Sequence, residues 1–253
     1  RDQMAQLREI CNYLEHRHKV LDEWGYGRKA VRTRGLNALF AGPSGTGKTM
    51  AAEIIAGDLG LELYRVDLST VVSKYIGETE KNLERIFEMA RDSNAILLFD
   101  EADALFGKRS ETHDAHDRYA NIEVSYLLQK IEEYDGIVIL TSNLRQNLDE
   151  AFLRRLQFSI EFPMPDEEAR LAIWQRLLPE AAPLHPSVDL ADMARRFKFS
   201  GGSIRNVLVN AAFLAAHDGQ VIRTEHLLWA ARREFQKLGR LVDESQFSPA
   251  RPL

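Results

Sequence analysis

The residues with the clearest chemistry in this sequence form the glycine-rich segment Gly42–Thr49, which reads Gly-Pro-Ser-Gly-Thr-Gly-Lys-Thr. It follows an apolar run at 36–41 that is typical of a buried strand, and it precedes an alanine-rich run at 49–59 that is typical of a helix. Glycines allow backbone N–H groups to turn inward around phosphate oxygens, and a helix start adds partial positive charge. The segment predicts a nucleotide phosphate site, with a plain glycine-rich turn as the alternative.

The polar residues of this segment have expected roles with ATP and Mg²⁺. Lys48 should contact the β- and γ-phosphates, and the hydroxyl of Thr49 should be a ligand of Mg²⁺. The predicted nucleotide-binding residues here are Gly42, Pro43, Ser44, Gly45, Thr46, Gly47, Lys48, Thr49 and Met50.

A second candidate set follows the apolar run 95–99, where Asp100 and Glu101 come next. Ligands of open α/β sheets bind at the carboxyl ends of the strands, and these carboxylates lie at such an end. We expect Asp100 to help hold Mg²⁺ and Glu101 to polarise the water that attacks the γ-phosphate. An ordinary acidic pair is the alternative, and the glycine-rich segment favours the catalytic interpretation.

Strand-like and helix-like runs alternate through the first two thirds of the chain, which predicts an α/β fold with a parallel sheet flanked by helices. After Pro163-Met164-Pro165 only helical patterns follow, so a small all-helical lid domain is expected. The expected strands are at 36–41, 61–66, 95–99, 136–140 and the end of 151–162. The expected helices are at 2–20, 49–59, 78–90, 119–131, 167–178, 189–197, 203–217 and 224–235. We predict an N-terminal helix and linker at 1–27, a nucleotide-binding domain at 28–163, a helical domain at 164–238 and a tail at 239–253.

Composition narrows the classes of function. The chain has 253 residues, of which 45% are hydrophobic, and a formal net charge of −5. It contains no run of about 18 apolar residues, so we expect no membrane span and a cytoplasmic location. The acidic balance makes a nucleic-acid partner unexpected, although a local basic cluster occurs at 28–34. The single cysteine, Cys11, excludes an internal disulfide, and no Cys or His spacing suits zinc.

Further residues resemble the AAA clade of AAA+ protein-remodelling ATPases, a clade that includes katanin. The resemblance covers about 20–235, and the segment 73–83 looks like the first pore loop and the helix after it. It implies that Tyr75, flanked by Lys74 and Ile76, lines a central pore and grips a protein substrate. A structural aromatic at a strand end is the alternative. Asp100-Glu101-Ala102-Asp103 also spells the DEAD-box helicase tetrad, but the other helicase motifs are missing.

The resemblance also implies a site shared between subunits of a homo-oligomer, with a hexamer expected. Asn143 matches the polar residue that helps Glu101 to position the attacking water, with turn capping as the alternative. Arg154 and Arg155 match arginine fingers that reach the γ-phosphate of a neighbouring subunit, with a surface pair as the alternative. Gly202 lies in the segment expected to contact the nucleotide from the helical domain.

Several points stay open at this stage. The role of Arg205 is undecided, and so is that of His113 and His116, for which a solvated loop is favoured over metal binding. Segment 24–27 fits either an adenine contact or a hydrophobic clamp. Two other functions remain as alternatives: a nucleic-acid-directed AAA+ module of the clamp-loader or initiator type, and an ATP-dependent scaffold.

Overall fold

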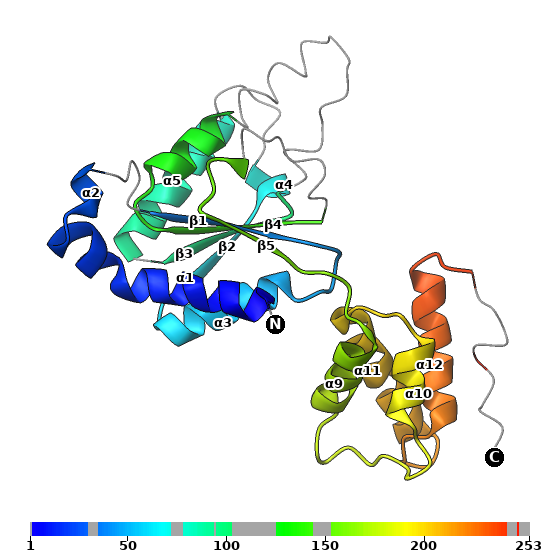
Figure 1. Cartoon of the computed structure of the whole chain (residues 1–253). Helices are drawn as coiled ribbons and strands as arrows, with labels where there is room; N and C mark the ends of the chain where they lie inside the picture. Colours follow the sequence, from blue (N-terminus) through cyan, green and yellow to red (C-terminus); the bar gives the residue numbers. More distant parts are fainter. Residues whose placement is uncertain are drawn as a thin grey trace. The chain divides into compact units, whose positions relative to one another are not determined.

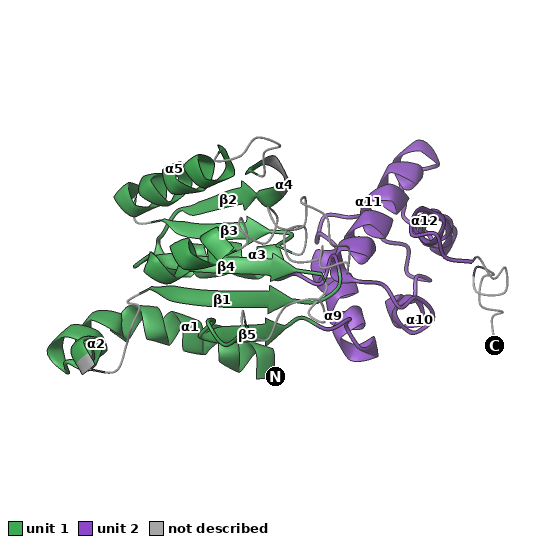
Figure 2. Cartoon of the chain, turned by 90° about the horizontal axis from the view of Figure 1, so that it is seen from above, with its two compact units in different colours: residues 1–43, 48–162 green, residues 44–47, 163–253 purple. Residues whose placement is uncertain are grey.

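The computed structural model describes residues 2–29, 35–71, 78–93, 95–102, 125–143, 153–241 and 247 (Figure 1). The chain divides into two compact units, which Figure 2 colours separately. Unit 1 comprises residues 1–43 and 48–162, and unit 2 comprises residues 44–47 and 163–253. Within the described ranges, no helix has both the length and the apolar character needed to cross a membrane.

Unit 1 is built on a parallel sheet whose described strands lie in the order β2, β3, β4, β1, β5. The strands are β1 (Leu36–Ala41), β2 (Leu63–Asp67), β3 (Ile96–Asp100), β4 (Ile137–Ser142) and β5 (Phe158–Glu161). Every residue of β1 and β4 is buried, as expected for central strands of a sheet covered on both faces. The predicted α/β sheet followed by a helical domain is confirmed.

Helices cover the two faces of this sheet. The helical elements are α1 (Asp2–His18), a π-helix (Lys19–Glu23), α2 (Tyr26–Lys29), α3 (Lys48–Leu59), α4 (Leu68–Val71), α5 (Glu78–Ser93) and a helix at 125–133. Figure 1 shows α1 and α3 on one side of the sheet and α5 on the other. Side chains alternate along each strand, so one set packs with α1 and α3 while the other packs with α5 and 125–133.

The boundaries of β2 show how a helix end moves a strand. The sequence predicts a strand at 61–66, but the structure begins β2 at Leu63. Gly60, with φ of +65°, ends α3 in the left-handed conformation, and the N–H of Leu61 bonds back to the carbonyl of Ala56 at 2.9 Å. This closing turn uses the Leu61 N–H that a strand would need.

Unit 2 packs four described helices around a separate core, and the sequence predicts each of them to within two residues at either end. They are α9 (Glu167–Leu177), α10 (Leu190–Arg196), α11 (Gly201–His217) and α12 (Thr224–Lys237). Trp174, Phe197 and Phe199 are completely or almost completely buried in this core. Ser200 caps α11 by accepting a hydrogen bond from the N–H of Ser203, which explains why this helix starts at Gly201.

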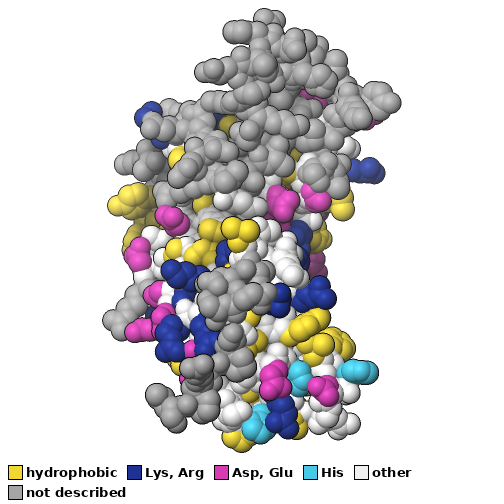
Figure 3. All heavy atoms as spheres, turned by 90° about the vertical axis from the view of Figure 1, so that its right-hand side faces the viewer, with side chains coloured by type: hydrophobic (Ala, Val, Ile, Leu, Met, Phe, Trp, Pro, Cys, Tyr) yellow, Lys and Arg dark blue, Asp and Glu magenta, His cyan; other side chains and the backbone are white. Residues whose placement is uncertain are grey.

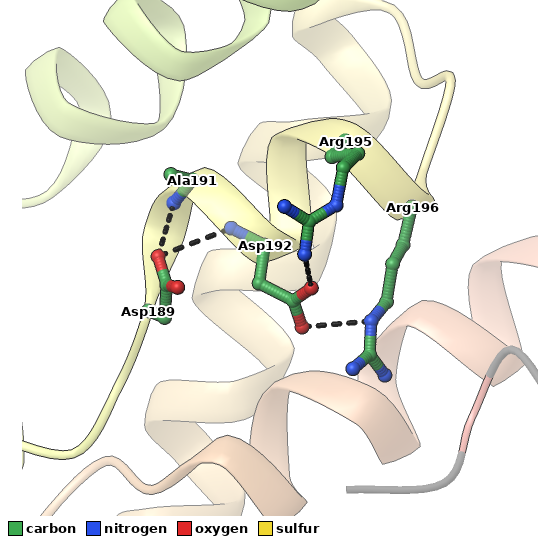
Figure 4. Close-up of polar contacts among 5 residues, drawn as sticks. All are labelled: Asp189, Ala191, Asp192, Arg195 and Arg196. Atoms are coloured by element: carbon green, nitrogen blue, oxygen red, sulfur yellow. Dashed lines mark hydrogen bonds and ion pairs between the residues drawn. The ribbon is translucent and has the colours of Figure 1, made fainter. Parts of the chain in front are cut away.

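Helix α10 is short and is held by polar contacts at both ends (Figure 4). The carboxylate of Asp189 accepts hydrogen bonds from the N–H groups of Ala191 and Asp192 and so caps the first turn. The carboxylate of Asp192 pairs with Arg195 and with Arg196, three and four residues further on. The Arg196 Nε lies 2.7 Å from Asp192 Oδ2, and these contacts stabilise a helix of only seven residues.

Candidate nucleotide-binding site

The glycine-rich loop turns sharply at the end of β1, directly beside the end of β4. The N–H of Gly42 donates to the carbonyl of Ser142 at 3.0 Å. A Cβ atom at Gly42 would lie 2.1 Å from the carbonyl oxygen of Phe162, and the residue has φ of +151°, so only glycine fits. Gly45 and Gly47 also have positive φ values, of +76° and +102°. The loop therefore has a backbone that bulkier residues could not adopt.

Lys48, the first residue of α3, turns its side chain back over this loop and is only 7% exposed. Its Nζ donates to the carbonyls of Gly42 at 2.7 Å and Pro43 at 3.0 Å. It also donates to Oδ1 of Asn143 at 2.9 Å, which joins the loop to the residue just after β4. The structure thus brings together Lys48 and Asn143, two residues that lie 95 positions apart in the sequence.

Asp100, at the end of β3, receives contacts from both neighbouring strands. The hydroxyl of Thr141 on β4 donates to Asp100 Oδ1 at 2.5 Å. The guanidinium of Arg65 on β2 forms an ion pair with Asp100 Oδ2, also at 2.5 Å. The Asp100 side chain is 14% exposed, so the carboxylate is held in place but still reaches solvent.

Glu101 has an unusual backbone, with φ of +55°. A non-glycine residue in this left-handed region is strained, and such strain is concentrated at functional sites. Thr141 holds the turn in this conformation, because its hydroxyl oxygen accepts from the Glu101 N–H at 3.1 Å while its carbonyl accepts from the Ala102 N–H at 2.8 Å. The Glu101 side chain is exposed.

These polar side chains share one face of the sheet. Asp100 pairs with Asp67 of β2, and Phe99 pairs with Leu140 of β4, which sets Asp100 level with Thr141. The alternating apolar residues on the same face pack with α1 and α3, the helix that begins with Lys48 and Thr49. The side chains of Lys48, Asp100, Thr141 and Asn143 therefore lie at the carboxyl ends of adjacent strands, where open α/β sheets bind ligands.

This donor set fits a polyphosphate with Mg²⁺. A cradle that a Cβ would fill, a helix start and the ammonium of Lys48 suit phosphate oxygens. A hydroxyl from Thr49 and a carboxylate from Asp100 are the oxygen ligands that Mg²⁺ takes. Met50, also expected to contact the nucleotide, is 59% exposed on α3.

The predicted arginine fingers lie in the turn just before β5, away from this cluster. Leu153 and Leu156 on either side of them pack into the core on the α5 face of the sheet. Arg155 forms an ion pair with Glu132 at 3.2 Å, with both side chains roughly half exposed. The structure thus places Arg155 on the opposite side of the sheet core from the side chains of Lys48 and Asp100.

Gly202 contacts a glycine of the loop within unit 2. Its N–H donates to the carbonyl of Gly45 at 3.0 Å, and a Cβ on Gly202 would lie 3.2 Å from the Gly45 Cα. A Cβ on Gly45, which has φ of +76°, would lie 2.5 Å from the hydroxyl of Ser200, so glycine is strongly favoured at this position. Arg205, whose role the sequence leaves open, is exposed on α11.

The pore segment, with Lys74, Tyr75 and Ile76, lies outside the described residues, as do His113 and His116. Trp24, in the segment expected to contact adenine or clamp the domains, is 62% exposed.

Two residues that hold Asp100, Arg65 and Thr141, are not predicted from the sequence. The sequence does show a cation near the end of the expected strand 61–66. It does not show that this strand lies beside the strand that ends in Asp100, which the register of β2 and β3 reveals. Thr141 lies just past the expected strand 136–140, and the structure extends β4 to Ser142. A hydroxyl in this position has no function that can be predicted until its neighbours across the sheet are known.

Charges of both signs lie close together on the face drawn in Figure 3. Dark blue Lys and Arg side chains gather beside magenta Asp and Glu side chains, with yellow hydrophobic ones between them. The coloured side chains give this face no single charge.

Two family models match consecutive parts of the chain. Residues 38–164 match the "ATPase family associated with various cellular activities (AAA)", and residues 166–237 match the "Contractile injection system ATPase helical domain". The first match covers both the glycine-rich loop and the acidic pair. The second covers α9 to α12 of unit 2.

Curated relatives are similar over a large part of this chain. A human katanin p60 ATPase-containing protein, the A-like 1 form, is 34% identical over 199 residues, which cover 74% of this chain and 40% of the relative. The mouse protein of the same name shows the same identity and coverage. The "Uncharacterized AAA family ATPase y4kL" of Sinorhizobium fredii is 39% identical over 142 residues, covering 54% of this chain and 42% of that protein. The chain thus spans about two fifths of the length of these relatives.

Proposed function

This chain belongs to the ATPase family associated with various cellular activities (AAA), and from that premise we propose that it hydrolyses ATP with Mg²⁺ to remodel a protein substrate. By family it is an ATPase. The observation that carries the proposal is the meeting of Lys48 with Asn143, beside the Asp100 carboxylate held by Thr141. A lysine ammonium, a carboxylate and a side-chain amide thus meet at one sheet edge, which supports their proposed roles in binding phosphate, holding metal and orienting water.

The residues divide the work of hydrolysis. Lys48 exchanges its neutral carbonyl acceptors for phosphate oxygens. Its hydrogen bonds to these are stronger, because the acceptor then also carries a charge. Thr49 and Asp100 would hold Mg²⁺, which would supply positive charge to offset the negative charge that develops on the phosphate oxygens. Glu101 takes a proton from the attacking water, and Asn143 keeps that water in line.

We further propose that the active unit is a ring of identical protomers, a hexamer by resemblance. Arg154 and Arg155 then act on the nucleotide of the neighbouring protomer. This is consistent with the position of Arg155 on the side of its own sheet that is opposite to the Lys48 side chain. Arg155 must leave Glu132 to do so, and an exposed ion pair costs only about 0.2–1 kcal/mol to break.

We propose that the protein substrate belongs to a contractile injection system. The helical domain matches a family model named for the ATPases of such systems, over the helices α9 to α12 of unit 2. Tyr75, with Lys74 and Ile76, is proposed to grip that substrate in the ring pore, since an aromatic ring contacts polypeptide of any sequence. A cytoplasmic location remains part of this proposal.

Phosphate release tests the enzymatic part of the proposal. At concentrations that form rings, the protein should release phosphate in a Mg²⁺-dependent manner, whereas Lys48→Ala should not bind ATP and Glu101→Gln should bind it without turnover. Hydrolysis that equals the Lys48→Ala background would refute the proposal.

Mixed assemblies test the shared site. Protomers with Arg154→Ala/Arg155→Ala, mixed with Lys48→Ala protomers, should recover part of the activity, because some interfaces then combine an intact loop with intact arginines. Absence of recovery would assign the arginines a local role. For the substrate, Tyr75→Ala should retain basal hydrolysis and lose the function of the injection system in cells, while equal loss of both would argue for a structural tyrosine.

A further inference from the structure

The Asp100 carboxylate has a cation of its own chain on one oxygen. Arg65 Nη2 contacts Asp100 Oδ2, while the Thr141 hydroxyl holds the other oxygen, Oδ1. The two partners differ in exposure, since Thr141 is 1% exposed and the Arg65 side chain is 64% exposed. The Thr141 contact is therefore a fixed part of the core, whereas the Arg65 contact can be exchanged for water.

The position of Arg65 follows from the strand geometry. Asp67 of β2 pairs with Asp100 of β3, and residues two apart on a strand share a face, so Arg65 lies on the face of the Asp100 carboxylate. Val66, which lies between Arg65 and Asp67, points to the opposite face and is buried in the core that packs with α5. Arg65 thus extends along the sheet surface toward the strand end rather than into a core.

We propose that Arg65 is a displaceable counter-ion of Asp100, whose release accompanies the binding of Mg²⁺ with the nucleotide. This inference rests on the proposed function of Asp100. A guanidinium and Mg²⁺ are both cations and compete for the negative charge of the same carboxylate. Asp100 keeps its Thr141 hydrogen bond in both states, so the carboxylate stays oriented while its cationic partner changes. Arg65 accordingly raises the Mg²⁺ concentration that the site requires.

The test measures ATP binding rather than turnover. In the Glu101→Gln background, the affinity for ATP is measured by calorimetry over a series of free Mg²⁺ concentrations. Arg65→Ala and Arg65→Gln should lower the Mg²⁺ concentration for half-maximal tight binding by about two- to fivefold, the range expected from an ion pair whose cation is exposed to solvent. Arg65→Lys keeps the positive charge and should restore the parental requirement. Arg85→Ala, which removes an exposed arginine of α5, is the matched control and should change nothing.

The variants separate the possible roles of Arg65. An unchanged Mg²⁺ midpoint in both Arg65→Ala and Arg65→Gln, or a higher one, overturns the proposal. A parental midpoint in Arg65→Gln alone also overturns it, because the hydrogen bond and not the charge would then matter. Should Arg65→Ala fail to fold, Arg65→Gln carries the same test with a side chain of similar length. If the Glu101→Gln protein with Arg65 intact binds no ATP at any Mg²⁺ concentration, the proposed function itself fails.

Discussion

Replacement of Thr141 by Val should loosen the acidic turn without disturbing the packing of β4. Valine has nearly the same shape, but it cannot donate to Asp100 Oδ1 or accept from the Glu101 N–H. A hydrogen bond to a carboxylate contributes about 1.5–3 kcal/mol, and a buried donor left unpaired costs about 1–3 kcal/mol. Because Asp100 still reaches water and the two effects overlap, we expect a loss of about 2–3 kcal/mol in the free energy of unfolding.

Two assays measure this effect. Scanning calorimetry should show a melting temperature lower by about 5–10 °C, since 1 kcal/mol corresponds to about 2–4 °C in a chain of this size. Hydrogen exchange should be faster at the Glu101 amide, which loses the Thr141 hydroxyl as its acceptor, and less affected at the Ala102 amide, which still donates to the backbone carbonyl of residue 141. Thr141→Ser, which keeps the hydroxyl, is the control. If the Val and Ser variants melt together and protect these amides equally, Thr141 does not position the acidic turn.

Three further changes probe other parts of unit 1. Gly42→Ala should lower the free energy of unfolding of unit 1 by several kcal/mol, about as much as a disruptive substitution in the core, because the added Cβ would clash with the Phe162 carbonyl. A calorimetric melting temperature close to that of the parent would contradict this clash. Burial raises the pKa of the Cys11 thiol, so fewer thiolates form at a given pH. Alkylation of this single cysteine by iodoacetamide should be slower in the native protein than in urea between pH 7 and about 9, and an equal or faster native rate would refute the assignment. Glu132→Gln should free Arg155 and raise ATP turnover in rings by up to about fivefold, and a fall in turnover would mean that Glu132 orients the arginine.

Much of the fold could be predicted because its signals are local. The buried strand at 36–41 is a continuous apolar run, and the structure reproduces it as β1 without a shift. The helices of unit 2 are predicted from their helical patterns, and the structure shows that local caps such as Asp166 and Asp189, which accept hydrogen bonds from N–H groups within three residues, fix where two of them begin. The boundary at 61–63 was less predictable, because it depends on how α3 ends at Gly60.

By itself, the sequence identified the candidate residues: a glycine loop with Lys48 and Thr49, and an acidic pair after a buried strand. These signals can be recognised without a structure, because each depends only on residues that are neighbours along the chain. Only the tertiary structure decided that Arg65 and Thr141 hold Asp100, that Asn143 meets Lys48, and that Glu101 has a left-handed backbone. Such contacts join separate strands, and the strand order and register of the parallel sheet, which no local pattern specifies, determine which side chains meet.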